Sequence, residues 1–213
     1  METRTKEIQR AWSNPVVQDL LLTYYRDWLF NTPEKTERTV ELILSITGHN
    51  PPAEIIDMGC GLGYHAMAFA KRGFRVFAFD PGDKYLEIAR GNAASAGADV
   101  EFHQMACDQL SEIDRFSLAW AGGYCLGQLS PAQVVKDFRR VYQSLRQGSW
   151  FVASVAGKPK IAPSKKALHW GELNDCFILS ENWTDDTYSH EHCWFVYPEK
   201  NEILKVIEVD RMY

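Results

Sequence analysis

The 213-residue chain lacks several features that would assign it to a common class of protein. Its 23 Lys and Arg residues are outnumbered by 28 Asp and Glu, and no basic run is longer than a pair such as Lys165-Lys166, which argues against a nucleic-acid substrate. No apolar run approaches the ~20 residues that cross a bilayer. The five cysteines form no CxxC pair, and the opening METRTKEIQR lacks the apolar stretch of a signal peptide. We therefore expect a cytoplasmic protein with free thiols and with neither nucleic acid nor membrane as a partner.

Strand and helix patterns alternate through the first three quarters of the chain. Helix starts are indicated at Asn14-Pro15 and Thr32-Pro33, before the alternation begins. Apolar strands then predict a parallel sheet with helices on both faces. The predicted strands cover residues 55–57, 74–79, 100–103, 116–120 and 150–155, and the predicted helices between them cover 64–72, 83–96 and 131–148.

The alternation stops after Gly157. A basic linker at 158–166 is followed by three stretches rich in aromatic and β-branched residues, which predict a small antiparallel β meander: 176–183, 188–197 and 202–212. The fold class predicted is α/β, with a doubly wound, mostly parallel Rossmann-like sheet, N-terminal helices and the meander at the C-terminus. We divide the chain into a helical lid (1–50), the Rossmann-like domain (51–157) and the β insert or cap (158–213).

A glycine-rich turn follows the first predicted strand, in the sequence IIDMGCGLGY of residues 55–64. Glycines allow the backbone to turn sharply and to approach a ligand closely. Asp80 closes the next strand, where a carboxylate can accept both ribose hydroxyls of a nucleoside. The dinucleotide fingerprint GxGxxG, if started at Gly59, would need glycine where Tyr64 stands.

An acid, three alternating glycines and a second acid at the end of the next strand resemble the class I S-adenosylmethionine-dependent methyltransferases. The resemblance covers residues 54–155, with Ser117 in place of an acid often found there. It implies S-adenosylmethionine as cofactor, with Asp57 steering its amino-acid end and Asp80 holding its ribose. It also implies that Asp108 binds adenine and that backbone near Trp120 and Ala121 faces the methionine part. Gly59, Gly61 and Gly63 would let the backbone pass beneath the cofactor.

Methyl transfer needs a nucleophile ~3–3.5 Å from the methyl carbon, more than it needs a fixed catalytic motif. Three side chains are candidates for a catalytic role: Tyr24, Tyr124 and His190. Tyr24 also suits a core aromatic, and Tyr124 a packing residue of a loop. His190 shares a strand face with His192, and because no third ligand is evident we expect no metal site.

The family's sheet normally continues with two further strands, whereas this sequence stops after the predicted meander. The strand at 151–155 would then leave an apolar sheet edge open. We therefore expect a second chain, either another polypeptide or a second copy, to cover that edge and form a hetero- or homo-oligomer.

Three functions remain open from the sequence. The first is methylation of a small molecule, in secondary metabolism or natural-product biosynthesis. The second is an enzyme of the same fold that performs an elimination or ring closure with the cofactor retained. The third is a subunit that stabilises a catalytic partner. Aromatic residues of the meander, such as Trp183 and Trp194, either line a substrate pocket or form the meander's own core.

Overall fold

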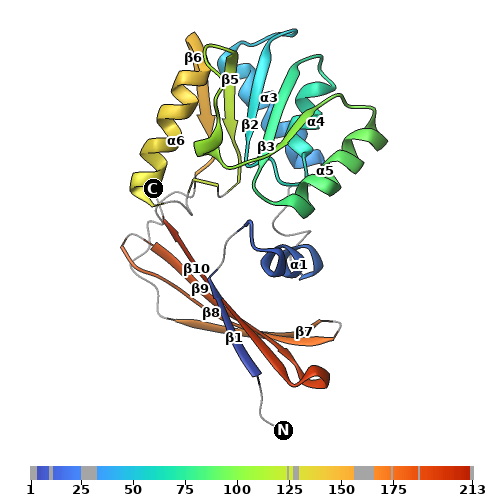
Figure 1. Ribbon diagram of the computed structural model, residues 1–213, viewed down its shortest axis with the longest axis vertical. Helices are drawn as coiled ribbons and strands as arrows, with labels where there is room; N and C mark the ends of the chain where they lie inside the picture. The colour runs from blue at the N-terminus through green and yellow to red at the C-terminus, as the bar shows by residue number, and fades with distance from the viewer. Residues whose placement is uncertain are drawn as a thin grey trace.

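The structure, a computed structural model, consists of two sheets with a helix between them (Figure 1). It describes residues 4–9, 12–24, 33–123, 125–126, 130–155, 166–173, 175–186 and 188–211. A five-stranded parallel sheet flanked by helices occupies one end of the molecule, and a five-stranded, mainly antiparallel sheet the other. This architecture confirms the predicted α/β fold class.

The parallel sheet has the strand order β4-β3-β2-β5-β6, and each neighbouring pair is parallel. Its strands are β2 (Glu54–Met58), β3 (Arg75–Asp80), β4 (Glu101–Gln104), β5 (Phe116–Ala121) and β6 (Leu145–Ala153). Its helices are α3 (Pro33–Thr47), α4 (Tyr64–Ala70), α5 (Asp83–Ala96) and α6 (Pro131–Ser144), and the short 3₁₀ helix η1 spans Cys107–Gln109.

Both faces of this sheet are buried, as the apolar strands predict. Ile55 packs on one side with residues of α3, α4 and α5, and its neighbour Ile56 packs on the other with residues of α6 and η1. Because successive side chains of a strand point to opposite faces, a strand covered on both sides reads as a continuous apolar run.

The second sheet has the order β1-β10-β9-β8-β7. Its strands are β1 (Arg4–Gln9), β7 (Ala167–Leu173), β8 (Cys176–Thr184), β9 (Tyr188–Tyr197) and β10 (Glu202–Arg211), and the 3₁₀ helix η2 (Pro198–Lys200) joins β9 to β10. The three predicted strands are present as β8, β9 and β10. The sheet is larger than predicted, because β7 and β1 extend it at its two edges.

Strand β1 corrects the prediction that residues 1–50 are helical. It lies parallel to β10, so that the start of the chain pairs with its last described strand. Three of its six residues are charged, and an edge strand tolerates such side chains because one side of it faces solvent. Because of these charged residues, the segment lacks the apolar pattern by which a strand is predicted from sequence.

Helix α1 (Pro15–Tyr24) lies between the two sheets and contacts both of them. Val17 and Leu21 pack against Leu62 and Tyr85 of the parallel-sheet domain. Leu20 packs against the antiparallel sheet, in a cluster with Cys176, Cys193, Phe195, Tyr197 and Val206. One short helix therefore contributes to two cores.

One boundary differs from the prediction. The helix expected to run to about Gly148 ends at Ser144, and β6 begins at Leu145 instead of Trp150. Leu145 pairs with Phe116 of β5, and the register then shifts before Leu118 pairs with Trp150. The early pairing extends the strand through polar residues that carry no strand signal. Most of the predicted linker, at 158–165, lies outside the described residues.

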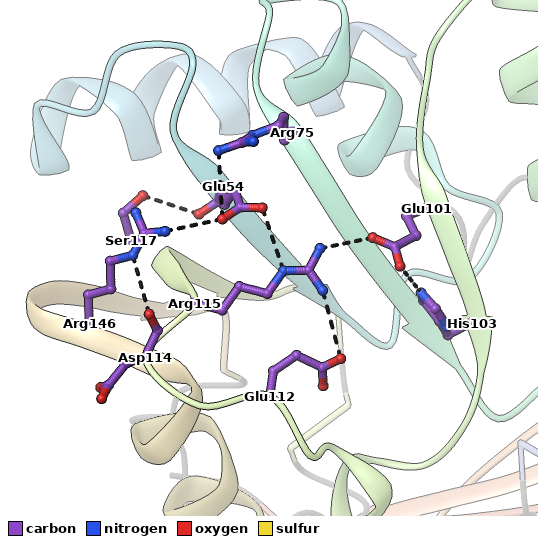
Figure 2. A network of polar contacts seen from close by, with 9 residues as sticks. All are labelled: Glu54, Arg75, Glu101, His103, Glu112, Asp114, Arg115, Ser117 and Arg146. Atoms are coloured by element: carbon purple, nitrogen blue, oxygen red, sulfur yellow. Dashed lines mark hydrogen bonds and ion pairs between the residues drawn. The ribbon is translucent and has the colours of Figure 1, made fainter.

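A network of charges holds the amino-terminal ends of the parallel strands together (Figure 2). Glu54, at the start of β2, forms ion pairs with three arginines. The N–O distances are 3.7 Å to Arg75, 3.5 Å to Arg115 and 3.2 Å to Arg146. Arg115 also donates to Glu101 at the start of β4 (2.9 Å). These residues come from all five strands of the sheet or the residues just before them, so the network fixes the strands at the end away from the glycine turn.

Replacing Glu54 with Gln is expected to lower the free energy of unfolding by about 1–2 kcal/mol, since several charge-assisted contacts lose their acceptor charge. The matched control is Glu34→Gln, because Glu34 pairs with Arg38 on an exposed helix surface. That change is expected to cost at most about 0.5 kcal/mol. Urea unfolding of both variants measures the difference. Equal effects would contradict the role of the Glu54 network in holding the strands together.

Candidate cofactor site

The glycine turn between β2 and α4 is built on three left-handed residues. Gly59, Gly61 and Gly63 have φ angles of 63°, 52° and 79°. The Cys60 N–H donates to the carbonyl of Phe79 (3.0 Å), which ties the turn to the end of β3. Gly63 then precedes the first residue of α4. The turn therefore exposes backbone at the carboxyl edge of the sheet, where α/β proteins bind ligands.

Asp80 lies at the end of β3 and clamps two backbone segments. Its Oδ2 accepts the Gly61 N–H (2.9 Å) and its Oδ1 accepts the Gly82 N–H (2.8 Å). Burial raises the pKa of this carboxyl to about 6, against the lowering effect of the two N–H donors. A carboxylate has about four acceptor positions, so two remain for a diol. The position suits the predicted ribose contact.

Asp57 lies on the neighbouring strand and is 2% exposed. The Ala66 backbone N–H bonds to this carboxylate, yet its Oδ2 has no hydrogen-bond partner among the described residues. Burial raises its pKa to about 8, and the charge of Asp80 adds to the rise. An unpartnered oxygen beside a second carboxylate is a feature that a cationic ligand group would satisfy.

Trp120 of β5 is the register partner of Asp57, so the two side chains leave the sheet on the same face. Its indole Nε1 is buried and has no hydrogen-bond partner in the described part of the chain. The His65 ring lies 5.3 Å from the Trp120 ring, and burial lowers its pKa to about 4. Ala121 is buried one residue further, beside Met58. The predicted methionine end of the site thus contains unsatisfied polar atoms.

The position of Asp108 is less constrained. It lies on η1, three residues after the Met105 N–H that donates to the Asp80 carbonyl (3.2 Å), and it is exposed. The chain after β4 is therefore fixed beside Asp80, while the contact of Asp108 with adenine stays a prediction.

The catalytic candidates do not lie together. Tyr24 and His190 are on opposite faces of the antiparallel sheet, since Tyr24 packs with Phe195 and the neighbouring side chains of β9 alternate. Tyr24 donates to Asp175 (2.9 Å), and burial raises its pKa well above the usual value. In the described contacts, neither residue touches Asp57 or Asp80, and Tyr124 lies outside the described residues.

His190 is held in a polar and aromatic setting of its own. Its Nε2 lies 2.7 Å from Asp185 Oδ2, and its ring stacks on Trp183 with centroids 4.8 Å apart. No group of three His, Cys, Asp or Glu side chains suited to a metal occurs within the described ranges. A catalytic role for this histidine stays a prediction.

Two side chains at the site were missed in the sequence. Gln18 of α1 accepts the Lys84 N–H at the start of α5 (3.0 Å), which docks the N-terminal helix beside the glycine turn. Cys125 lies close to Gly59: a Cβ added at Gly59 would be 3.1 Å from the Cβ of Cys125. Gln18 was hidden among the apolar residues of its helix, and no pattern marks Cys125, which follows β5 in a loop.

Gly63→Ala is expected to destabilise the protein and weaken ligand binding. The new Cβ would meet Phe102 at 3.0 Å and Ala89 at 3.1 Å, in addition to the cost of a left-handed residue. Gly97→Ala is the matched control, because Gly97 is also left-handed (φ 61°) but has open space around the added Cβ. We expect about 1–2 kcal/mol for Gly97→Ala and more for Gly63→Ala, by urea unfolding. Equal losses would mean that packing at Gly63 is unimportant.

Comparisons with known proteins find methyltransferases that resemble this chain. Residues 55–148 match a methyltransferase domain family. The chain is 36% identical over 114 residues to a ubiquinone biosynthesis O-methyltransferase of Pseudomonas entomophila, covering 50% of this chain and 46% of that protein. It is 28% identical over 166 residues to a release factor glutamine methyltransferase of Koribacter versatilis, covering 62% and 58%. The chain thus spans about half the length of the curated relatives it matches.

A solved structure has a similar fold over most of the chain. The crystal structure of an S-adenosylmethionine-dependent methyltransferase from Clostridium acetobutylicum superposes with a TM-score of 0.69, covering 92% of this chain and 80% of that one at 15% identity. At this identity the likeness shows the fold, antiparallel sheet included. The match of residues 55–148 to a methyltransferase domain supports the predicted cofactor, S-adenosylmethionine. Among the residues that the structure describes, no helix has the length and hydropathy of a membrane span.

Proposed function

We propose that the protein is an S-adenosylmethionine-dependent methyltransferase that acts on a small organic acceptor. The observation that carries the proposal is the pair of buried carboxylates, Asp57 and Asp80, at the carboxyl ends of adjacent parallel strands around a left-handed glycine turn. Asp80 has acceptor capacity left for the two ribose hydroxyls. The unpartnered Oδ2 of Asp57 suits the cationic amino-acid end.

The cofactor supplies an activated methyl group on a sulfonium. The chain's part is to hold that group in line with an acceptor and to keep water away. The buried Trp120 side chain, on the same sheet face as Asp57, and the adjoining glycine turn suit such a role. The proposal includes a contact of Asp108 with adenine. It also places Tyr24, Tyr124 or His190 near the acceptor.

A small acceptor is supported by two features. The net charge of −5 disfavours a nucleic-acid substrate, and the antiparallel sheet contributes an aromatic surface of the kind that binds organic molecules. The Pseudomonas relative is named for ubiquinone biosynthesis, which favours the same class, although the Koribacter relative is named for a release factor. Secondary metabolism as the source of the acceptor follows from the sequence resemblance alone.

Turnover with a panel of phenols, amines and carboxylic acids tests the activity. Formation of S-adenosylhomocysteine that depends on the acceptor and is lost in Asp80→Asn supports methyl transfer. Conversion of an acceptor without formation of S-adenosylhomocysteine would favour the elimination or ring-closure alternative. Binding of the cofactor without any conversion across the panel and with native extracts would favour a supporting subunit.

A second chain over the β6 edge is a further part of the proposal. Strand β6 is at the end of the described parallel sheet, and Trp150 on it is exposed, as is Phe138 of the adjacent α6, which packs on Phe151 (5.3 Å). Trp150→Lys is expected to prevent such a complex, measured by light scattering. An unchanged molecular mass would contradict it.

A further inference from the structure

The two edges of the antiparallel sheet differ sharply in character. At one edge, β1 has the sequence RTKEIQ, and its Thr5, Lys6 and Glu7 side chains are exposed. Charged residues of this kind prevent edge strands from pairing with other chains. At the other edge, β7 has the sequence ALHWGEL, with neither lysine nor proline, and within the described residues it pairs only with β8. The charged residues are therefore concentrated at the β1 edge, whereas β7 carries a single charge, on the exposed Glu172.

The β7 edge also carries the most exposed apolar side chains among those that the structure describes in this sheet. Trp170 is 80% exposed and Leu168 is 76% exposed, and both lie on the face that points away from α1. Their register places Trp170 opposite Leu179 and beside Phe177 of β8, which are also exposed. These four residues form one apolar patch, and patches of this kind on a soluble protein usually mark an interface.

We propose that two copies of the chain associate by antiparallel pairing of β7 with β7 about a twofold axis at Trp170. The strand is seven residues long and Trp170 is its central residue, so every position finds a partner strand position in the second copy. Directly opposite residues of an antiparallel pair share a face. Trp170 would therefore meet its own equivalent, and Leu168 would lie opposite the partner's Glu172, on the face of the patch.

The same register accounts for Gly171, which the chain's own packing does not explain. A Cβ at Gly171 would have no atom within 4 Å, so no close approach within this chain demands glycine there. A glycine in a strand interior often marks the approach of another group. In the proposed pairing, the exposed His169 of one copy lies opposite Gly171 of the other, where the missing side chain leaves room for the imidazole ring.

Apolar side chains of β7 add buried surface to the backbone pairing of the two strands. Aromatic side chains bury about 150–250 Å² each, and Trp170 is mostly exposed in a single copy. Leu168, which is 76% exposed, adds further apolar surface on the same face. The pairing is isologous and closes on itself, so it stops at a dimer.

Light scattering of the full chain tests the pairing. The wild type is expected at twice the mass of the 24.4 kDa chain, and Trp170→Lys at the mass of one chain, with an unchanged circular dichroism spectrum. Leu42→Lys on α3 is the control, because Leu42 is also an exposed apolar side chain but lies on neither sheet edge. A monomeric wild type, or a dimer that survives Trp170→Lys, would overturn the proposal.

Cysteine cross-linking tests the register. Trp170→Cys is expected to form an intermolecular disulfide on mild oxidation, since opposite Cα atoms in an antiparallel pair are about 4.5–5.5 Å apart. His169→Cys is expected to form little, because its own equivalent is displaced along the strand. The native cysteines are buried or half-buried, so the wild type serves as the blank. Equal cross-linking at both positions, or stronger cross-linking at position 169, would contradict this register.

Discussion

Asp80→Asn is expected to weaken binding of S-adenosylhomocysteine at least about a hundredfold. Each hydrogen bond from a ribose hydroxyl to a charged acceptor contributes roughly 1.5–3 kcal/mol, and the carboxylate is placed to accept two. Asparagine keeps the shape of the side chain and one oxygen for the Gly61 N–H, so the turn is expected to persist. Equilibrium dialysis with the labelled ligand measures the change.

The control for this experiment is Asp83→Asn, three residues along the chain. Asp83 is exposed on the first turn of α5, and its replacement is expected to leave the affinity within about twofold. Comparable losses in both variants would indicate a general electrostatic effect, and an unchanged affinity in Asp80→Asn would remove the ribose assignment.

Asp57→Asn is expected to make the ligand-free protein more stable at pH 8 and to weaken its ligand binding. The folded state raises the pKa of Asp57 from 3.8 to about 8, chiefly through burial, so it binds a proton that the unfolded state has released. The free energy of unfolding therefore falls as the pH rises from the unfolded pKa of 3.8 to the folded pKa of about 8. Above about pH 8 it falls no further on account of Asp57. Asparagine carries no charge to bury, so the variant lacks this decline.

The decline is best measured between about pH 6.5 and 8, by the thermal midpoint of the ligand-free protein. Asp80, with a pKa of about 6, and His65, with a pKa of about 4 against an ordinary 6.5, change their proton binding mainly below this window. Asp99→Asn, at an exposed site, is expected to follow the wild type. A wild-type thermal midpoint that rises between pH 6.5 and 8 would contradict the raised pKa of Asp57. So would a midpoint that falls equally with pH in Asp57→Asn.

The sequence was most informative where burial and chain geometry act locally. The apolar strands that end near Asp57 and Asp80 and the glycines between them are compatible with few backbone conformations. The parallel sheet and its glycine turn were therefore predicted correctly. Strand β1 was missed because its charged residues are those of an edge, and its pairing with β10 joins the two ends of the chain. Nothing local in residues 4–9 specifies that contact.

The site was predictable in its backbone and less so in its periphery. Gln18 and Cys125 reach the glycine turn from elements distant in sequence, and a single side chain of this kind leaves no periodic signal. Tyr24 illustrates the converse problem. It lies on the predicted helix, but that helix packs on two cores, and the periodicity does not say which core a given residue faces.

The central claim is that the Asp57–Asp80 turn binds S-adenosylmethionine, and calorimetric titration of the wild-type chain with S-adenosylhomocysteine at pH 8 tests it most directly. We predict one binding site per chain with micromolar affinity, and no displacement of the bound ligand by a nicotinamide dinucleotide. A folded chain that gives no binding heat with S-adenosylhomocysteine at any temperature tried, or that binds the dinucleotide in its place, would contradict the account.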